Sequence, residues 1–197
     1  MSATDRHLIL VKHAAPTVIP GLPPARWRLS DEGRRGCAAL AARLARVVEP
    51  GTIAASDEPK ARETAALLAA QLGFADALRV ERDLREHERR PGDFFPDPAA
   101  FRAAVRDLFA RPDDLVFGRE TARAAGRRFA AAVGRILAES PRGDVIIVAH
   151  GTVIALFVAA QAGLAPFPLW ESLQLPSYVV LALPDLRWVK TQASVAG

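Results

Sequence analysis

Two histidines, His13 and His150, each follow a short apolar run that is typical of a buried β-strand. The runs are residues 8–11 and 145–149. The imidazole group changes protonation near neutral pH, so a pair of histidines can take part in nucleophilic and proton-transfer chemistry. A single histidine in such a place is more often an ordinary core residue. Two of them, at the ends of two strands, favour a functional site.

The elements that must position these histidines alternate between strands and helices. We expect strands at residues 6–13, 52–56, 78–84, 144–149, 178–183 and 186–190, with the last two paired around Pro184 and Asp185. We expect helices at residues 30–48, 58–72, 119–139 and 152–162, and residues 98–110 also have helical spacing. This alternation predicts an α/β fold with a mainly parallel sheet. Ligands bind at the carboxyl ends of strands in such sheets, where both histidines are expected.

The composition indicates one globular domain and excludes several classes of protein. The chain has 197 residues and a mass of 21.2 kDa, and 50% of its residues are hydrophobic. Its one cysteine, Cys37, rules out a disulfide framework and a cysteine-rich zinc site. The sequence contains no glycine-rich loop that ends in Lys-Ser or Lys-Thr, which argues against a P-loop NTPase.

The charge and hydropathy of the chain indicate which partners and which cellular location to expect. The formal net charge is +4, but the arginines are scattered among alanines and acidic residues, so we do not expect nucleic-acid binding. Residues 145–170 are uncharged, yet their prolines and glycines favour a strand, a turn and a buried helix over a membrane span. The first apolar run is too short for a signal peptide, so we expect a cytoplasmic protein. No pattern indicates an oligomeric state.

Five short segments carry a family resemblance. They are Leu8-Ile9-Leu10-Val11-Lys12-His13-Ala14, Leu29-Ser30-Asp31-Glu32-Gly33-Arg34, Ser56-Asp57-Glu58-Pro59-Lys60-Ala61-Arg62-Glu63-Thr64-Ala65, Leu84-Arg85-Glu86 and Val148-Ala149-His150-Gly151. In this order they resemble the Arg-His-Gly, Leu-Thr-x-x-Gly, Ser-x-x-x-Arg-Ala-x-x-Thr-Ala, Leu-x-Glu and His-Gly motifs of the histidine phosphatase (phosphoglycerate mutase-like) superfamily. The resemblance covers nearly the whole chain. It implies a single three-layer α/β/α domain, residues 1–197, with a short cap insertion at about residues 86–118.

The resemblance also implies a role for each matching residue. His13 would be the nucleophile that forms a phosphohistidine, with His150 and Gly151 beside the phosphoryl group. Glu86 would be the general acid and then the general base, although Glu88 lies close enough in sequence to be the alternative. The resemblance implies neither a cofactor nor a metal. We therefore expect a metal-independent phosphatase that acts on a small phosphomonoester.

Two departures from the family pattern concern phosphate binding. Lys12 and Lys60 stand where the family has phosphate-clamping arginines, and Ala14 adds a methyl group where the family has glycine. Lysine keeps the positive charge but loses the planar fork that holds two phosphate oxygens. Only three of the 26 basic residues are lysines, so we interpret these two as retained for a pocket that needs point charges. The alternative function is a relative that binds phosphate or a phosphorylated ligand with little catalysis. A mutase fits less well, because the insertion is short.

The remaining candidates lie outside the five motifs or have a structural role. Arg28 is a candidate for an extra phosphate contact, beside Arg26 and Trp27 at the pocket mouth, although an exposed basic loop explains the same residues. The aromatic residues of the insertion could cover the site or pack a short helix; they are Phe94, Phe95 and Phe101. Ser56 is expected to cap the helix that follows it, and His7 and His87 are expected on the surface.

Overall fold

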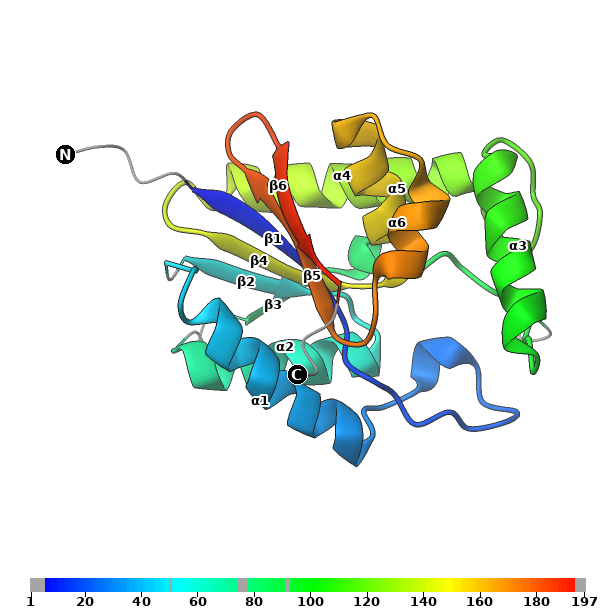
Figure 1. The fold of residues 1–197 in the computed structure, drawn as a ribbon, viewed down its shortest axis with the longest axis horizontal. Helices are drawn as coiled ribbons and strands as arrows, with labels where there is room; N and C mark the ends of the chain where they lie inside the picture. The colour runs from blue at the N-terminus through cyan, green and yellow to red at the C-terminus, as the bar shows by residue number, and fades with distance from the viewer. Residues whose placement is uncertain (1–5, 50, 74–77, 91–92, 194–197) are drawn as a thin grey trace.

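Strands and helices alternate along most of the chain (Figure 1). The computed structural model describes residues 6–49, 51–73, 78–90 and 93–193. The strands are β1 (His7–Lys12), β2 (Thr52–Ala55), β3 (Leu78–Val80), β4 (Val145–Ala149), β5 (Ser177–Ala182) and β6 (Arg187–Gln192). The α-helices are α1 (Asp31–Leu44), α2 (Pro59–Leu72), α3 (Pro98–Ala110), α4 (Ala122–Ala138), α5 (Gly151–Ala162) and α6 (Pro166–Ser172). Two short 3-10 turns are η1 (Pro24–Arg26) and η3 (Arg82–Leu84).

The six strands form one sheet in the order β3-β2-β4-β1-β5-β6. The first four of these strands run parallel, whereas β5 is antiparallel to β1 and β6 is antiparallel to β5. The mainly parallel α/β sheet is therefore confirmed, and the two last strands pair as expected. The strands β1 and β4 are central neighbours, so their carboxyl ends meet at one edge of the sheet.

Helices cover both faces of the sheet, which is why its central strands are apolar along their whole length. Alternate side chains of β1 point to opposite faces. Leu8 and Leu10 join the core with α4 and α5, whereas Ile9 and Val11 join the core with α1 and α2. Figure 1 shows these two pairs of helices on opposite sides of the strands. The three-layer α/β/α arrangement follows from this double burial.

Local signals fix several helix ends. The Ser30 hydroxyl caps α1 by accepting a hydrogen bond from the N–H of Gly33 (3.0 Å). Gly73 ends α2 in the left-handed conformation, at φ 81°. The helix expected at residues 119–139 begins at residue 122, because the Thr121 hydroxyl accepts a hydrogen bond from the N–H of Ala124 (3.1 Å).

The predicted strand at residues 78–84 is wrong beyond Val80. The Glu81 carboxylate accepts a hydrogen bond from the N–H of Asp83 (3.2 Å), and the chain turns into η3. Leu84 is fully buried at the end of this turn, so its apolar side chain packs without continuing the strand. The short elements η1 and α6, which both begin with proline, were not expected.

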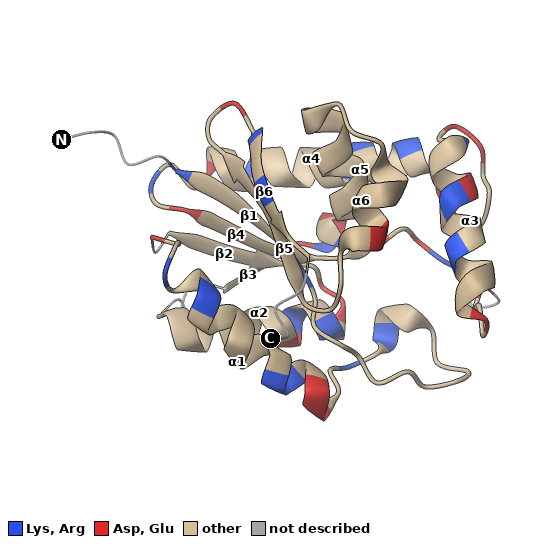
Figure 2. Ribbon diagram, in the orientation of Figure 1, with Lys and Arg blue, Asp and Glu red and all other residues tan. Residues whose placement is uncertain are grey.

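The uncharged segment at residues 145–170 folds as β4, α5 and the start of α6. Within the described ranges, no helix combines the length and apolar character needed to cross a membrane. Figure 2 shows the charged residues mainly in loops and on helices, while the strands carry few of them. The apolar character of this segment is thus used for packing inside the protein.

In the described part of the insertion at residues 86–118, one α-helix forms, α3. This helix stands beyond the carboxyl ends of the strands and packs against α6 (Figure 1). The rings of Phe101 and Trp170 meet edge to face between the two helices, with centroids 5.7 Å apart. Val105 and Leu108 are fully buried on the inner face of α3. The insertion is therefore tied to the main body beside the edge where β1 and β4 end.

Candidate active site

The carboxyl ends of β1 and β4 bring His13 and His150 together. Lys12 lies opposite Ala149 in the register of these strands, and the N–H of His13 donates to the carbonyl of Ala149 (3.0 Å). The two imidazole rings meet edge to face, with centroids 5.2 Å apart. Both side chains are buried. Two histidines that are far apart in sequence thus form one pair at the sheet edge.

The imidazole of His13 is held in one orientation and in its neutral form. Its Nδ1 lies 2.8 Å from the carbonyl oxygen of Ala14, which can only accept, so Nδ1 carries the proton and donates it. Burial lowers the pKa of His13 well below its ordinary value, and the nearby His150 and Lys60 lower it further. Nε2 is left with a free lone pair, which is what a nucleophilic imidazole needs.

His150 is fixed by Ser56 and Glu58. Its Nε2 lies 2.9 Å from the Ser56 hydroxyl oxygen and 3.5 Å from a carboxylate oxygen of Glu58. Burial lowers the pKa of His150 well below its ordinary value, and the positive charges of Lys60 and Arg89 add to this effect. The prediction that Ser56 caps α2 is wrong, because Glu58 occupies the position before the helix. Ser56 instead positions the second histidine.

The carboxylate of Glu86 is held at the start of α5. One oxygen accepts a hydrogen bond from the N–H of His87 (2.9 Å), and the other accepts one from Thr152 (3.1 Å) in the first turn of the helix. The positive end of the helix dipole favours a carboxylate at this place. Glu88 also lines the cavity, but its carboxylate is 42% exposed and lies 3.7 Å from Arg85. Glu86 is thus the glutamate fixed at the end of β4.

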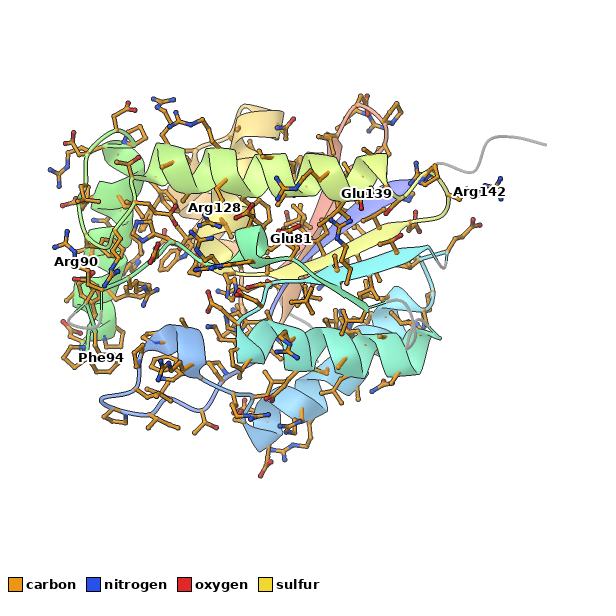
Figure 3. The ribbon with its side chains drawn as sticks, turned by 180° about the vertical axis from the view of Figure 1, so that it is seen from behind. Glu81, Arg90, Phe94, Arg128, Glu139 and Arg142 are labelled. Atoms are coloured by element: carbon orange, nitrogen blue, oxygen red, sulfur yellow. The ribbon has the colours of Figure 1, made fainter. Side chains whose placement is uncertain are left out.

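A part-buried arginine on α4 holds the segment that carries Glu86. The guanidinium of Arg128 donates to three backbone carbonyls at 2.7, 3.0 and 3.2 Å, which belong to Asp83, Arg85 and Glu86. It also pairs with the carboxylate of Glu120 (2.6 Å). Figure 3 labels Arg128 on α4, next to the η3 turn. This arginine lies more than 40 residues from Glu86 in sequence, and no motif pointed to it.

Lys12 lies in the cavity with one protein partner. Its ammonium group donates a hydrogen bond to the carbonyl of Leu173 (2.6 Å). Burial lowers the pKa of Lys12 to about 8, although the negative charge of Glu86 opposes the shift. Lys12 is therefore a cation that loses its charge within the range of mildly alkaline pH.

Lys60 is buried and has two protein partners. Its ammonium group donates to the carbonyl of Pro24 (2.8 Å) and forms an ion pair with the carboxylate of Glu58. The same Glu58 accepts a hydrogen bond from the N–H of Glu86 (2.9 Å). The pair of Lys60 and Glu58 therefore links α2, the η1 turn and the segment that carries Glu86.

Gly151 and Ala14 have different surroundings. A Cβ atom at Gly151 would lie 3.2 Å from Cε of Lys12 and 3.3 Å from Nε1 of Trp170, so a larger residue would crowd both side chains. Ala14 is fully buried, packs against Leu29 and does not line the cavity. The methyl group that Ala14 adds in place of the family's glycine therefore packs in the core beside Leu29.

The histidine pair, the two lysines and Glu86 line one cavity of about 540 Å³, which has two chemically different parts. We call the polar part the floor; it consists of Lys12, His13, Lys60, Glu86, His150 and Gly151. We call the aromatic part the walls; they consist of Trp27, Phe94, Phe95, Phe101 and Trp170. The rings of Trp27 and Phe94 meet edge to face, with centroids 6.3 Å apart. Figure 3 shows Phe94 beside the segment that contains η1, so two distant loops meet at the mouth.

Several loop predictions have a different outcome. Arg28 does not line the cavity: its exposed guanidinium lies 2.7 Å from the carboxylate of Glu63 on α2. The expectation of a phosphate contact from Arg28 is therefore not supported by its position. The expectation of a surface position for His87 is wrong, because this residue is only 3% exposed and its Nε2 lies 2.7 Å from the carbonyl of Glu120. The three phenylalanines do line the cavity, and Phe101 also packs against the body.

Arg89 and Trp170 were missed by the sequence motifs. The Cζ atom of Arg89 lies 4.3 Å from the centre of the Phe101 ring, and both residues line the cavity. Trp170 comes from α6, a helix that the sequence did not indicate. Only the position of Arg89, three residues after Glu86, was a signal that could have found it. Among the described residues, no group of three or more His, Cys, Asp or Glu is arranged to hold a metal ion.

A known protein family matches this chain. The model of the histidine phosphatase superfamily (branch 1) matches residues 24–192. The match includes Lys60, Glu86 and His150 and begins after His13. No curated protein matches the chain.

Solved structures share the fold over nearly the whole chain. A mycobacterial glucosyl-3-phosphoglycerate phosphatase in complex with inorganic phosphate is 26% identical, with 98% of both chains covered and a TM-score of 0.70. A chain described as mycobacterial hydrolase 1 is 25% identical, with 98% of this chain and 99% of that chain covered and a TM-score of 0.71. YhfR of Bacillus stearothermophilus, at 22% identity, shows the same fold, with 97% and 98% covered and a TM-score of 0.74. The family match and the common fold show that this chain belongs to the histidine phosphatase superfamily.

Proposed function

We propose that the protein is a phosphatase that hydrolyses a small phosphomonoester through a phosphohistidine on His13. The observation that carries this proposal is the fixed, neutral imidazole of His13, whose Nδ1–H is bound to the carbonyl of Ala14. Nε2 attacks the phosphorus atom and the bond to the leaving oxygen breaks. His150 donates a hydrogen bond to the phosphoryl group, and the ammonium groups of Lys12 and Lys60 balance its negative charge.

Glu86 moves the protons of both half-reactions. In the first step its carboxyl group gives a proton to the leaving oxygen, so that an alcohol departs. In the second step the carboxylate takes a proton from a water molecule, which attacks the phosphorus atom while the bond to His13 breaks. Inorganic phosphate is released and Glu86 is protonated again. Its position supports this role, because Thr152 and His87 fix both carboxylate oxygens at the end of β4.

The walls favour a leaving group with apolar or aromatic surface. Five aromatic side chains line the cavity beside the polar floor. An alcohol with apolar surface that is buried against them gains about 25 cal/mol per Å². A leaving group made only of hydroxyl groups has fewer partners there.

The second candidate is a protein that binds phosphate or a phosphorylated ligand with little catalysis. It is favoured by the partners of the two lysines, since both ammonium groups already donate to acceptors of the protein. A lysine held in this way offers fewer donors to a transition state.

One experiment separates the two functions. The protein is mixed with a phosphoester labelled in its phosphoryl group, quenched in alkali and tested for bound label, while binding of inorganic phosphate is measured by calorimetry. If the protein is a phosphatase, the wild-type protein carries label after the quench and the His13→Ala variant carries none. A binding protein binds phosphate but carries no label and releases no alcohol, and this result would reject the proposal.

A further inference from the structure

Arg89 is a cation of the cavity that the proposed mechanism does not use. It lies between Glu86 and α3, and its guanidinium stacks over the ring of Phe101 with a distance of 4.3 Å to the ring centre. This contact holds the guanidinium at the face of the ring and leaves its N–H groups free to donate. The group is therefore held in the cavity wall before any ligand binds.

The guanidinium of Arg89 has no bonding partner among the described residues. No hydrogen bond and no ion pair within 4 Å joins it to them, whereas the neighbouring Arg85 lies 3.5 Å from Asp83. Arg82 and Arg90 also line the cavity without such a partner, but both are exposed to water. Arg89 is part-buried, and burial lowers its pKa against the attraction of Glu86 and Glu58. A desolvated guanidinium with five free donors is costly unless an anion satisfies it.

The two lysines of the floor cannot hold two oxygens of one phosphoryl group as an arginine can. Lys60 already has two acceptors and Lys12 has one, and an ammonium group acts as a point charge. A guanidinium can instead hold two oxygens of one phosphoryl group through parallel hydrogen bonds. The side chains that line the cavity comprise six cations and four carboxylates, which leaves two positive charges for a phosphate dianion.

We propose that Arg89 binds the phosphoryl group of the ligand through two N–H donors and supplies the planar fork that Lys12 and Lys60 lack. The identity of the anion rests on the proposed function. Arg89 is placed for this contact because it lines the same cavity as His13 and His150. Arg89 belongs to the insertion, so a phosphoryl group bound to it would join the insertion to the ends of β1 and β4.

Calorimetric titration with inorganic phosphate tests this inference, because phosphate has no leaving group. We expect Arg89→Lys and Arg89→Gln each to weaken phosphate binding by about tenfold or more. The matched control is Arg106→Lys on α3, whose guanidinium stacks over Phe167 at 4.8 Å outside the cavity. This control should bind phosphate within about twofold of wild type. Melting temperatures of all variants show whether they are folded.

Two results would overturn the inference. The first is that the Arg89→Lys variant binds phosphate as tightly as wild type, even if Arg89→Gln binds it weakly, because a point charge would then suffice. The second is that the wild-type protein binds no phosphate at millimolar concentration. Failure of the proposed function is a separate result, because it appears as absent labelling of His13 in a protein whose phosphate binding still depends on Arg89.

Discussion

The floor and the walls of the cavity are held in different ways. The floor side chains His13 and His150 follow central strands that are buried on both faces. The walls come from the loops that carry Trp27, Phe94 and Phe95 and from the helices α3 and α6. Trp27 and Phe94 meet through ring edges, and Phe94 is one-third exposed. Central strands of a covered sheet are rigid, whereas exposed loops move more easily. In the proposed function, the floor performs the chemistry and the walls select the leaving group.

The largest effect is expected from removing the proposed nucleophile of the floor, His13. His13→Ala should lower kcat by about 10³-fold or more, because no other group forms the covalent intermediate. The control is His7→Ala, at the other end of β1, where the imidazole lies 3.5 Å from Asp144. This control should keep its activity. Steady-state hydrolysis of an aryl phosphate measures both variants, and a His13→Ala enzyme with a tenth of wild-type activity would contradict the assignment.

Replacing the proposed proton carrier of the floor, Glu86, should give the next largest effect. Glu86→Gln should lower kcat by about 10²- to 10⁴-fold for alkyl phosphates, whose leaving oxygen needs a proton. The loss should be smaller for p-nitrophenyl phosphate, whose leaving group departs without one. Glu88→Gln is the matched control and should stay near wild type. Equal losses in both variants, or a larger loss in Glu88→Gln, would assign the proton transfer elsewhere.

The charge of Lys12 should make phosphate binding depend on pH. Below about pH 8 Lys12 is protonated and attracts phosphate, and above that pKa the charge is lost. The dissociation constant for phosphate should therefore rise above pH 8, by up to about tenfold per pH unit. Lys12→Arg should remove this rise, because a guanidinium stays charged.

The matched control for the pH experiment is Lys190→Arg, since Lys190 lies on β6 outside the cavity. It should bind phosphate with the pH profile of wild type. A wild-type profile that is flat from pH 7 to pH 9.5 would show that Lys12 does not act as a titrating phosphate ligand.

The walls should give the smallest and most selective effect. Trp27→Ala should lower kcat/KM for an aryl phosphate by about three- to tenfold and leave that for glycerol phosphate nearly unchanged. The control is Trp188→Ala on β6, whose exposed ring does not line the cavity. Equal losses for both substrates in Trp27→Ala would mean that this wall supports the fold rather than the choice of leaving group.

The floor could largely be anticipated from the sequence. Continuous apolar runs indicated the two central strands, and parallel strand ends must meet at one edge, so His13 and His150 could be placed together. The short edge strand β3 was overestimated, because the hydrogen bond from Asp83 to Glu81 that turns the chain is a side-chain contact.

The supporting contacts could not be anticipated, because they join segments that are distant in sequence. Ser56 has the residue type of a helix cap, but the neighbouring ends of β2 and β4 bring its hydroxyl to His150. Arg28 has the residue type of a phosphate ligand, but its guanidinium forms an ion pair with Glu63 on α2. Arg128 reaches the Glu86 segment from α4 across the core. Local patterns define elements and motifs, whereas side-chain pairing depends on the completed packing.

The central claim is that the phosphoryl group passes through His13. The most direct measurement is rapid quenching of wild type with an aryl phosphate, followed by peptide mass spectrometry under alkaline conditions. We predict one added phosphoryl group on the peptide that contains His13 and none on the peptide that contains His150. Phosphorylation of His150, or steady turnover with an unmodified His13 peptide at every quench time, would contradict the account.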